Sequence, residues 1–208
     1  PQALGLHWLS KFHGVYLGLP PGVGKTLVTM LGAVVLDSRQ PVLVAPATLH
    51  RDKTSNDFAR YQKDWVPHYK SPTLLNLEAL SLDQNLLWLD KAKPDLVMID
   101  EGDLLRNPES AAFVRLDRYR AATLEANHRA AFMVLTGSGM RFGIEDYATH
   151  INWCLPWGDS PIPYDQDQRE MWFEALRSRP KGRPNNASRR PRAGVLLELC
   201  ALPRMAAE

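Results

Sequence analysis

Residues 19–26 read Leu-Pro-Pro-Gly-Val-Gly-Lys-Thr and combine two glycines, a lysine and a hydroxyl in one short turn. Glycine lets a backbone approach an anion closely, and N–H groups at a helix N-terminus bind phosphate oxygens. We expect Lys25 to reach the β- and γ-phosphates of a nucleotide and the Thr26 hydroxyl to bind Mg²⁺. The expected nucleotide contacts in this run are Pro21, Gly22, Val23, Gly24, Lys25, Thr26 and Leu27.

The strict phosphate-loop pattern begins with glycine, and here that position is Leu19. The alternative to a phosphate loop is a chance match in an ordinary loop. An apolar run before the turn, near 14–18, is typical of a buried strand, and residues 27–36 are apolar enough for a packed helix. A strand, a glycine-bearing turn and a helix in this order favour the phosphate loop.

Three carboxylates, Asp100, Glu101 and Asp103, lie at the end of an apolar run that starts at Pro94. In phosphate-loop enzymes an aspartate at such a strand end helps to hold Mg²⁺, which is the role expected of Asp100. A neighbouring glutamate can orient or deprotonate a water molecule, and we expect Glu101 to do so. The alternative is an acidic cap on the following helix. Asp100, Glu101 and Lys25 are therefore the expected catalytic residues.

Both groups of residues need elements that bring them together. Apolar strand-like runs alternate with helix-like segments, which predicts an α/β fold with a mostly parallel sheet flanked by helices. Ligands in such sheets bind beyond the carboxyl ends of the strands, where both motifs fall. The expected strands are 14–18, 42–45, 73–77, 95–100 and 131–136, and the expected helical segments are 26–37, 51–64, 79–91 and 109–127.

The composition of the 208 residues is that of a globular protein, with 45% hydrophobic side chains. No apolar stretch is long enough to cross a membrane or is flanked like a signal peptide, so we expect an intracellular protein that does not engage a membrane. Cys154 and Cys200 are too few for a disulfide framework or a zinc site, and each is expected to be a small buried side chain.

The last fifty residues differ from the rest. Residues 1–176 carry 17 basic and 21 acidic side chains, whereas 177–192 carry seven basic side chains, three prolines and no acid. We expect a compact domain over 1–157 and an extension over 158–208, with an amphipathic helix at 166–176 and a further helix at 195–205. The basic segment is either a contact for a phosphate backbone or a solvated linker.

The order of these motifs resembles the first motor lobe of superfamily 2 helicases and translocases, and within it the chromatin-remodeller-like, Snf-type branch. The resemblance covers about residues 1–157 and implies a RecA-like phosphate-loop lobe. Residues 2–9 look like the opening glutamine motif of that family, which implies that Gln2 reads adenine. Residues 100–103 match its acidic box as Asp-Glu-x-Asp, although the closest branch usually ends that box in histidine.

Two further stretches carry the resemblance. Residues 42–49 are similar to a strand and loop that touch the DNA backbone, which implies DNA contacts at Pro46, Ala47 and Thr48. Residues 134–139 resemble the motif that couples nucleotide state to DNA binding, which implies that role for Thr136, Gly137 and Ser138.

The resemblance implies an ATPase that hydrolyses ATP to ADP and phosphate, with ATP and Mg²⁺ as cofactors and duplex DNA as partner. We expect the second lobe, which carries arginine fingers in such motors, to be supplied in cis or in trans. Residues 195–204 are a candidate for its beginning. The alternative function is a non-catalytic ATP-binding or DNA-docking module of a larger assembly. A phosphate-loop kinase or AAA-type ATPase is disfavoured, because neither has the Gln2 and Thr136 motifs.

Overall fold

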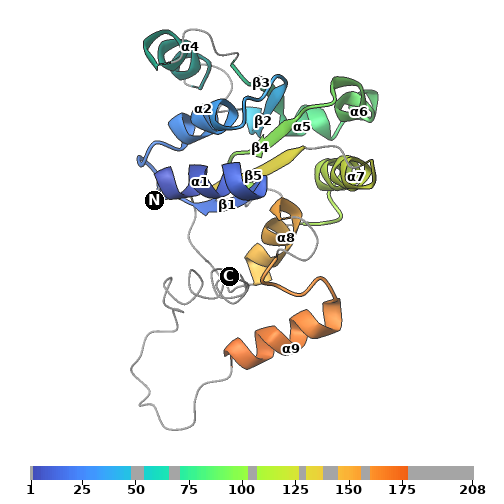
Figure 1. Ribbon diagram of the computed structural model, residues 1–208. Coiled ribbons are helices and arrows are strands. Elements are labelled where there is room, and N and C mark those ends of the chain that lie inside the picture. Colours follow the sequence, from blue (N-terminus) through green and yellow to red (C-terminus); the bar gives the residue numbers. More distant parts are fainter. Residues whose placement is uncertain are drawn as a thin grey trace.

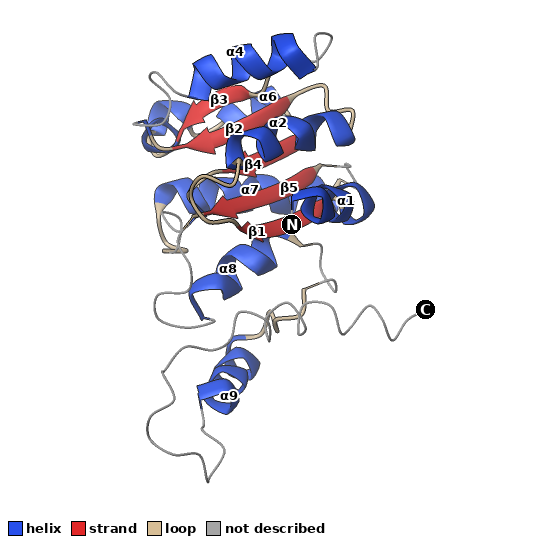
Figure 2. Cartoon of the chain, turned by 90° about the vertical axis from the view of Figure 1, so that its left-hand side faces the viewer, coloured by secondary structure: helices blue, strands red, loops and turns tan. Residues whose placement is uncertain are grey.

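The computed structural model describes residues 2–47, 54–65, 71–102, 107–126, 130–137, 145–155 and 160–177. Over these residues five strands form one sheet in the order β1-β5-β4-β2-β3, with every neighbouring pair parallel. Figure 2 shows them stacked from β3 at the top to β1 at the bottom. The strands are β1 (Gly14–Gly18), β2 (Pro41–Ala45), β3 (Thr73–Asn76), β4 (Leu96–Ile99) and β5 (Ala131–Thr136).

The three central strands are buried on both faces, so their side chains divide between two cores. Met98 of β4 and Met133 of β5 lie in the core on one face, whereas Val97 and Val134 lie in the core on the other. Continuous apolar runs are what a parallel sheet covered on both faces requires. The predicted α/β fold of the RecA-like kind, with a parallel sheet flanked by helices, is therefore confirmed.

Helices cover both faces of the sheet (Figure 1). The first core is covered by α1 (Gln2–Phe12), α2 (Lys25–Val35) and α4 (Thr54–Trp65), through side chains such as Leu9, Met30 and Phe58. The second core is covered by α5 (Leu77–Leu80), α6 (Trp88–Ala92), α7 (Ala111–Glu125) and the end of α8 (Glu145–Cys154). Cys154 is buried here, and burial raises the pKa of its thiol, as expected of a packed and unreactive cysteine. Cys200 lies outside the described residues.

Each expected strand is present within one or two residues of its predicted bounds, and 14–18 and 131–136 match in full. The expected helices at 26–37, 109–127 and 166–176 correspond to α2, α7 and α9 (Gln166–Arg177). Of the expected 51–64 segment, α4 begins at Thr54, and residues 51–53 lie outside the described part. The helix expected at 195–205 also lies outside it.

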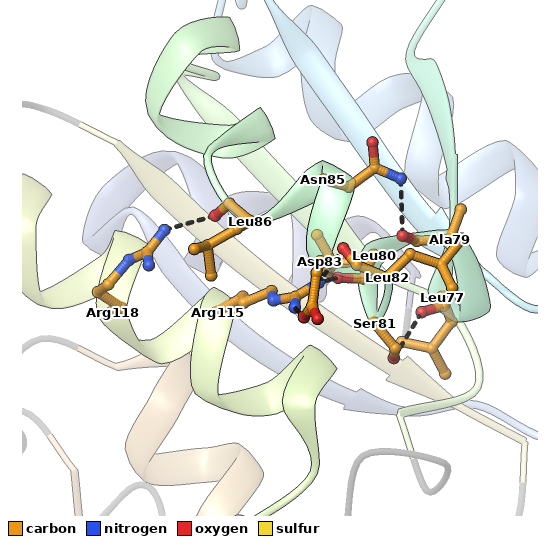
Figure 3. Close-up of polar contacts among 10 residues, drawn as sticks. All are labelled: Leu77, Ala79, Leu80, Ser81, Leu82, Asp83, Asn85, Leu86, Arg115 and Arg118. Atoms are coloured by element: carbon orange, nitrogen blue, oxygen red, sulfur yellow. Dashed lines mark hydrogen bonds and ion pairs between the residues drawn. The ribbon is translucent and has the colours of Figure 1, made fainter.

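The helical segment expected over 79–91 is present in pieces and is not one continuous helix. The segment forms α5, a 3-10 turn η1 (Asp83–Asn85) and α6. Arg115 of α7 donates to the carbonyl oxygens of Leu80 and Leu82, so a distant guanidinium takes up acceptors that a continuous helix would use internally (Figure 3). Asn85 also donates to the carbonyl of Ala79, at 2.8 Å. Contacts from α7 and a contact within the segment therefore hold its broken path.

The chain beyond α8 folds back onto that helix. Ile162, which precedes α9, and Phe173 of α9 are buried against Ala148 and Ile151 of α8. In Figures 1 and 2, α9 lies beyond α8, on the side away from the sheet. The described part of the expected 158–208 extension thus contacts the sheet layer through α8.

Candidate functional site

Three strand ends meet at one edge of the sheet. β1 leads through residues 19–24 into α2, β4 leads into Asp100 and Glu101, and β5 leads into Gly137. Because β5 lies between β1 and β4, the segment after β5 separates the phosphate-loop motif from the acidic motif. The carboxyl ends of parallel strands point to the same edge, so residues far apart in the sequence are brought together.

The contact that joins the two motifs is an ion pair between Lys25 and Glu101. Lys25 Nζ lies 2.7 Å from Glu101 Oε1, across a separation of 76 residues in the chain. The side chain of Lys25 is 13% exposed and that of Glu101 is 32% exposed. A half-buried cation depends on its anionic partner more than a fully exposed lysine does. The structure thus brings together the expected catalytic lysine and glutamate.

The phosphate-loop backbone has the conformation that its glycines predict. Gly22 and Gly24 both have φ of 83°, in the left-handed region where a Cβ atom is disfavoured. Gly24 is the N-cap of α2, and no side chain of the loop accepts a hydrogen bond from the first turn of that helix. The N-terminal end of α2 therefore has N–H groups that an external anion can accept from.

Leu19, which replaces the usual first glycine, is integrated into the sheet. Its N–H donates to the carbonyl oxygen of Thr136 at 2.9 Å, which extends the pairing of β1 with β5 by one residue. Its side chain is buried in the core that α1 and α2 cover. Because Leu19 pairs with β5, the unpaired part of the loop starts one residue later, and the glycines next to α2 keep their positions.

The side chain of Gln2 lies on the phosphate loop. Its Nε2 donates to the carbonyl oxygen of Val23, and the same nitrogen would stand 3.0 Å from a Cβ atom on Gly24. The glutamine that the resemblance assigns to adenine is thus in contact with the loop expected to hold the phosphates. Of the other expected contacts, Pro21 and Val23 are exposed, and Thr26 and Leu27 are half-buried.

The acidic motif has an unusual backbone. Glu101 has φ of 55°, a left-handed conformation uncommon for a residue with a side chain. Its N–H donates to Asp100 Oδ1 at 2.9 Å, and the Asp100 N–H donates to Val44 of β2. At Gly102 a Cβ atom would collide with the Val134 side chain. Asp103, the last acid of the box, lies outside the described residues.

The coupling motif is described as far as Gly137. Thr136 is 2% exposed, and Ser138 lies outside the described residues. A Cβ atom on Gly137 would stand 2.5 Å from Lys25 Nζ and 3.6–3.7 Å from the two carboxylate oxygens of Glu101. The Lys25–Glu101 pair therefore lies directly against the bare backbone that follows β5.

The loop expected to touch DNA follows β2, the strand next to β4. Pro46 and Ala47 are half-buried, and Thr48 lies outside the described residues. The N–H of Ala47 donates to Glu78 Oε2 at 3.3 Å. Asn76 at the end of β3 caps α5, accepting from the N–H groups of Glu78 and Ala79. The acid at position 78 thus already binds one N–H group of this loop.

One residue behind the site was not predicted. His150 of α8 is 3% exposed, lies beside the ring of Tyr16, and has Cδ2 3.8 Å from the position of a Cβ on Gly102. Nothing in the local sequence signals this contact, because α8 reaches the acidic motif only through the folding of the sheet. His150 therefore links α8 to the strand end that carries Glu101.

Comparison with models of known protein families finds no match, and comparison with curated proteins also finds none. The functional argument therefore depends on the geometry of this chain. None of the described helices has the length and apolar character that crossing a bilayer requires.

Proposed function

We propose that this chain is the ATP-binding lobe of an ATP-dependent DNA translocase or helicase of the superfamily 2 type. The observation that carries the proposal is the meeting of Lys25, Glu101 and Gly137, which come from three motifs and three strand ends. A lysine at a helix N-terminus and a carboxylate within hydrogen-bond reach of it are the groups that phosphoryl transfer uses. The second lobe is supplied in cis or in trans.

The residues present fit a nucleotide with its magnesium ion. Gly24 begins α2 without a side-chain cap, so N–H groups and the helix dipole favour an anion there. Lys25 would contact the phosphate oxygens, and Thr26 and Asp100 would hold the metal. Over the described residues there is no group of three or more His, Cys, Asp or Glu side chains arranged for a metal. Magnesium commonly takes one or two protein carboxylates together with phosphate oxygens, so two protein ligands are enough.

The chain's own residues divide the work of hydrolysis. When bound, Mg²⁺ neutralises charge on the phosphate oxygens. Lys25 orients the phosphates, and Glu101 accepts a proton from the attacking water once its carboxylate is free of Lys25. Gln2 binds the adenine edge while remaining beside the phosphate loop. Gly137 lies against both charged groups and is therefore placed to transmit their arrangement to β5.

The DNA part of the proposal is supported by the position of the loop after β2. This loop opens at the same sheet edge as the acidic motif, because β2 pairs with β4. Arg60 and Lys63 on α4 are exposed near it in sequence. Contacts of this kind bind phosphates without reading base sequence, so the proposal names duplex DNA as a backbone ligand and no particular sequence.

The proposal is tested by nucleotide titration and phosphate release on the full chain, with and without duplex DNA. Glu101→Gln keeps the size of the side chain and removes the base. We expect MgATP still to bind and phosphate release to fall by about 10²–10⁴-fold where the second lobe is present. Glu109→Gln makes the same chemical change at an exposed position and is the matched control. Absence of MgATP binding to the parent chain would refute the proposal, and binding without any DNA-stimulated release would favour the non-catalytic module.

A further inference from the structure

The ion pair between Lys25 and Glu101 joins two groups that the proposed function assigns to different tasks. Lys25 is expected to bind phosphate, and Glu101 is expected to activate water. In the structure Lys25 Nζ lies 2.7 Å from Glu101 Oε1, within the range of a strong charge-assisted hydrogen bond. A carboxylate in this position presents to Lys25 the same kind of charged oxygen that a phosphate would present.

The backbone around Glu101, whose side chain reaches Lys25, has an uncommon conformation. A φ of 55° costs free energy for a residue with a Cβ atom and persists only where the surroundings fix it. Asp100 Oδ1 accepts from the Glu101 N–H, and the Val134 side chain leaves no room for a Cβ atom on Gly102. Asp100 thus holds the Glu101 N–H, and the absence of a side chain at Gly102 lets the chain pass close to Val134.

The backbone of Gly137 lies against both the Lys25 ammonium and the Glu101 carboxylate. A methyl group there would stand 2.5 Å from Lys25 Nζ, closer than non-bonded atoms approach, so the ammonium rests on the bare backbone after β5. The carboxylate oxygens are 3.6 and 3.7 Å from the same point. The pair is therefore enclosed by the phosphate loop, the acidic motif and the segment after β5.

We propose that the Glu101 carboxylate is an internal competitor for the phosphate group at Lys25, so that phosphate binding must displace it. The inference rests on the proposed function, because it assumes that Lys25 binds phosphate. Two anions that share one ammonium repel each other, so the paired and the phosphate-bound arrangements exclude one another. The apparent nucleotide affinity is then lowered by the fraction of molecules in which Glu101 holds Lys25. The same displacement frees Glu101 to accept a proton, which links nucleotide binding to release of the base.

Simple charge repulsion offers a rival account, since any acid near the phosphates weakens their binding. Glu101→Asp separates the two accounts. It keeps the negative charge at the site but shortens the side chain by one methylene, so the carboxylate no longer reaches Lys25. Competition predicts tighter MgATP binding in both Glu101→Asp and Glu101→Gln, whereas repulsion predicts tighter binding in Glu101→Gln alone.

The experiment combines two measurements on the full-length chain. MgATP is titrated into the parent, Glu101→Asp, Glu101→Gln and the control Glu109→Gln. We expect both Glu101 variants to bind about three- to tenfold more tightly, the range that a partly exposed charge pair spans, and the control to be unchanged. Without nucleotide, an amine-reactive reagent followed by mass spectrometry should label Lys25 faster in both Glu101 variants than in the parent and the control.

The inference is overturned if Glu101→Asp binds MgATP no more tightly than the parent, or if Lys25 is labelled equally in all four proteins. Failure of the proposed function has a different signature. In that case none of the four proteins binds MgATP, and the competition inference falls with it. Folding of each variant is checked by its thermal transition, so that loss of binding is not mistaken for loss of structure.

Discussion

Two cations of the described part, the buried Arg115 and the half-buried Lys25, have acceptors of different kinds. The side chain of Arg115 on α7 is 7% exposed, and it donates to the carbonyl oxygens of Leu80 and Leu82 and to Asp83 Oδ1, the last at 3.0 Å (Figure 3). The side chain of Lys25 is 13% exposed, and it donates to the carboxylate of Glu101.

The two cations differ in whether their acceptor can be displaced. The carbonyl oxygens around Arg115 belong to a fixed backbone. Removing the guanidinium would take away the donor to the Leu80 carbonyl, whereas the Leu82 carbonyl would keep the N–H of Asn85. The carboxylate beside Lys25 is at the end of a flexible side chain that is one-third exposed, and water or another anion can take its place. Burial of a cation is thus no evidence of function in itself. The exchangeable acceptor is what distinguishes the candidate site from the scaffold.

Arg115→Ala tests the scaffold half of this comparison and has the largest expected effect. The carbonyls of Leu80 and Leu82 lose the guanidinium as a donor, and the path from α5 to α6 loses this contact with α7. We expect a loss of about 2–4 kcal/mol in unfolding free energy, measured by chemical denaturation. The MgATP affinity of the folded fraction should not change. A loss of less than about 0.5 kcal/mol would show that Arg115 is dispensable and would remove the contrast with Lys25.

Lys25→Ala tests the other half. It removes the charge that faces the phosphates, so MgATP affinity should fall more than tenfold by fluorescence titration, or more than about 1.4 kcal/mol. Stability should change little, because the Glu101 carboxylate can be hydrated once the lysine is gone. Unchanged affinity would count against the nucleotide site. A large drop in stability would instead make Lys25 a structural cation like Arg115.

Tyr119 provides a smaller, pH-dependent test on the scaffold side. Its hydroxyl donates to the carbonyl of Pro94 at 2.7 Å, and burial, aided by Asp90 and Asp95, raises the pKa of Tyr119 to about 12. The folded pKa lies above that of the unfolded chain, near 10, so this contribution to stability is complete below pH 10 and is lost as the pH rises to about 12.

The matched variant is Tyr119→Phe. At neutral pH it should lose about 1 kcal/mol with the hydrogen bond. Between pH 10 and 12 its stability should fall less steeply than that of the parent, as followed by denaturant midpoints. Parallel pH profiles for the two proteins would contradict the shifted tyrosine. MgATP affinity at neutral pH should be the same in both, because Tyr119 lies on the face away from Lys25.

The sequence was a good guide where information is local or periodic. The strand at 131–136 was predicted in full because apolar residues run without interruption through a strand buried on both faces. The strand at 14–18 lies at the edge of the sheet, and its short apolar run was enough to predict it in full. The meeting of Lys25 with Glu101 followed from placing both at strand ends of a parallel sheet. The adenine, DNA and coupling roles remain predictions.

What the sequence could not supply depends on distant partners. The 79–91 segment has the leucine content of a helix, yet its path is set by Arg115, more than twenty residues further on. Nothing in the sequence near Gly102 indicates that Val134 excludes a side chain there, or that the backbone of Glu101 is left-handed. Equally, the contact of Gln2 with Val23 joins α1 to a loop that the chain reaches only after β1.

Because β5 lies between β1 and β4, it sets the distance between the strand ends that carry the two motifs. Neighbouring strands lie about 4.8 Å apart, so one intervening strand separates the phosphate loop from the acidic motif by roughly 10 Å. Lysine and glutamate side chains together can span that width, and they meet against the backbone of Gly137. Hydrogen bonding between strands fixes the width, independently of the side chains at the two rims. The strand spacing thus fixes the distance between the phosphate loop and the acidic motif, and substitutions at positions 25 and 101 change the chemistry between them without changing that distance.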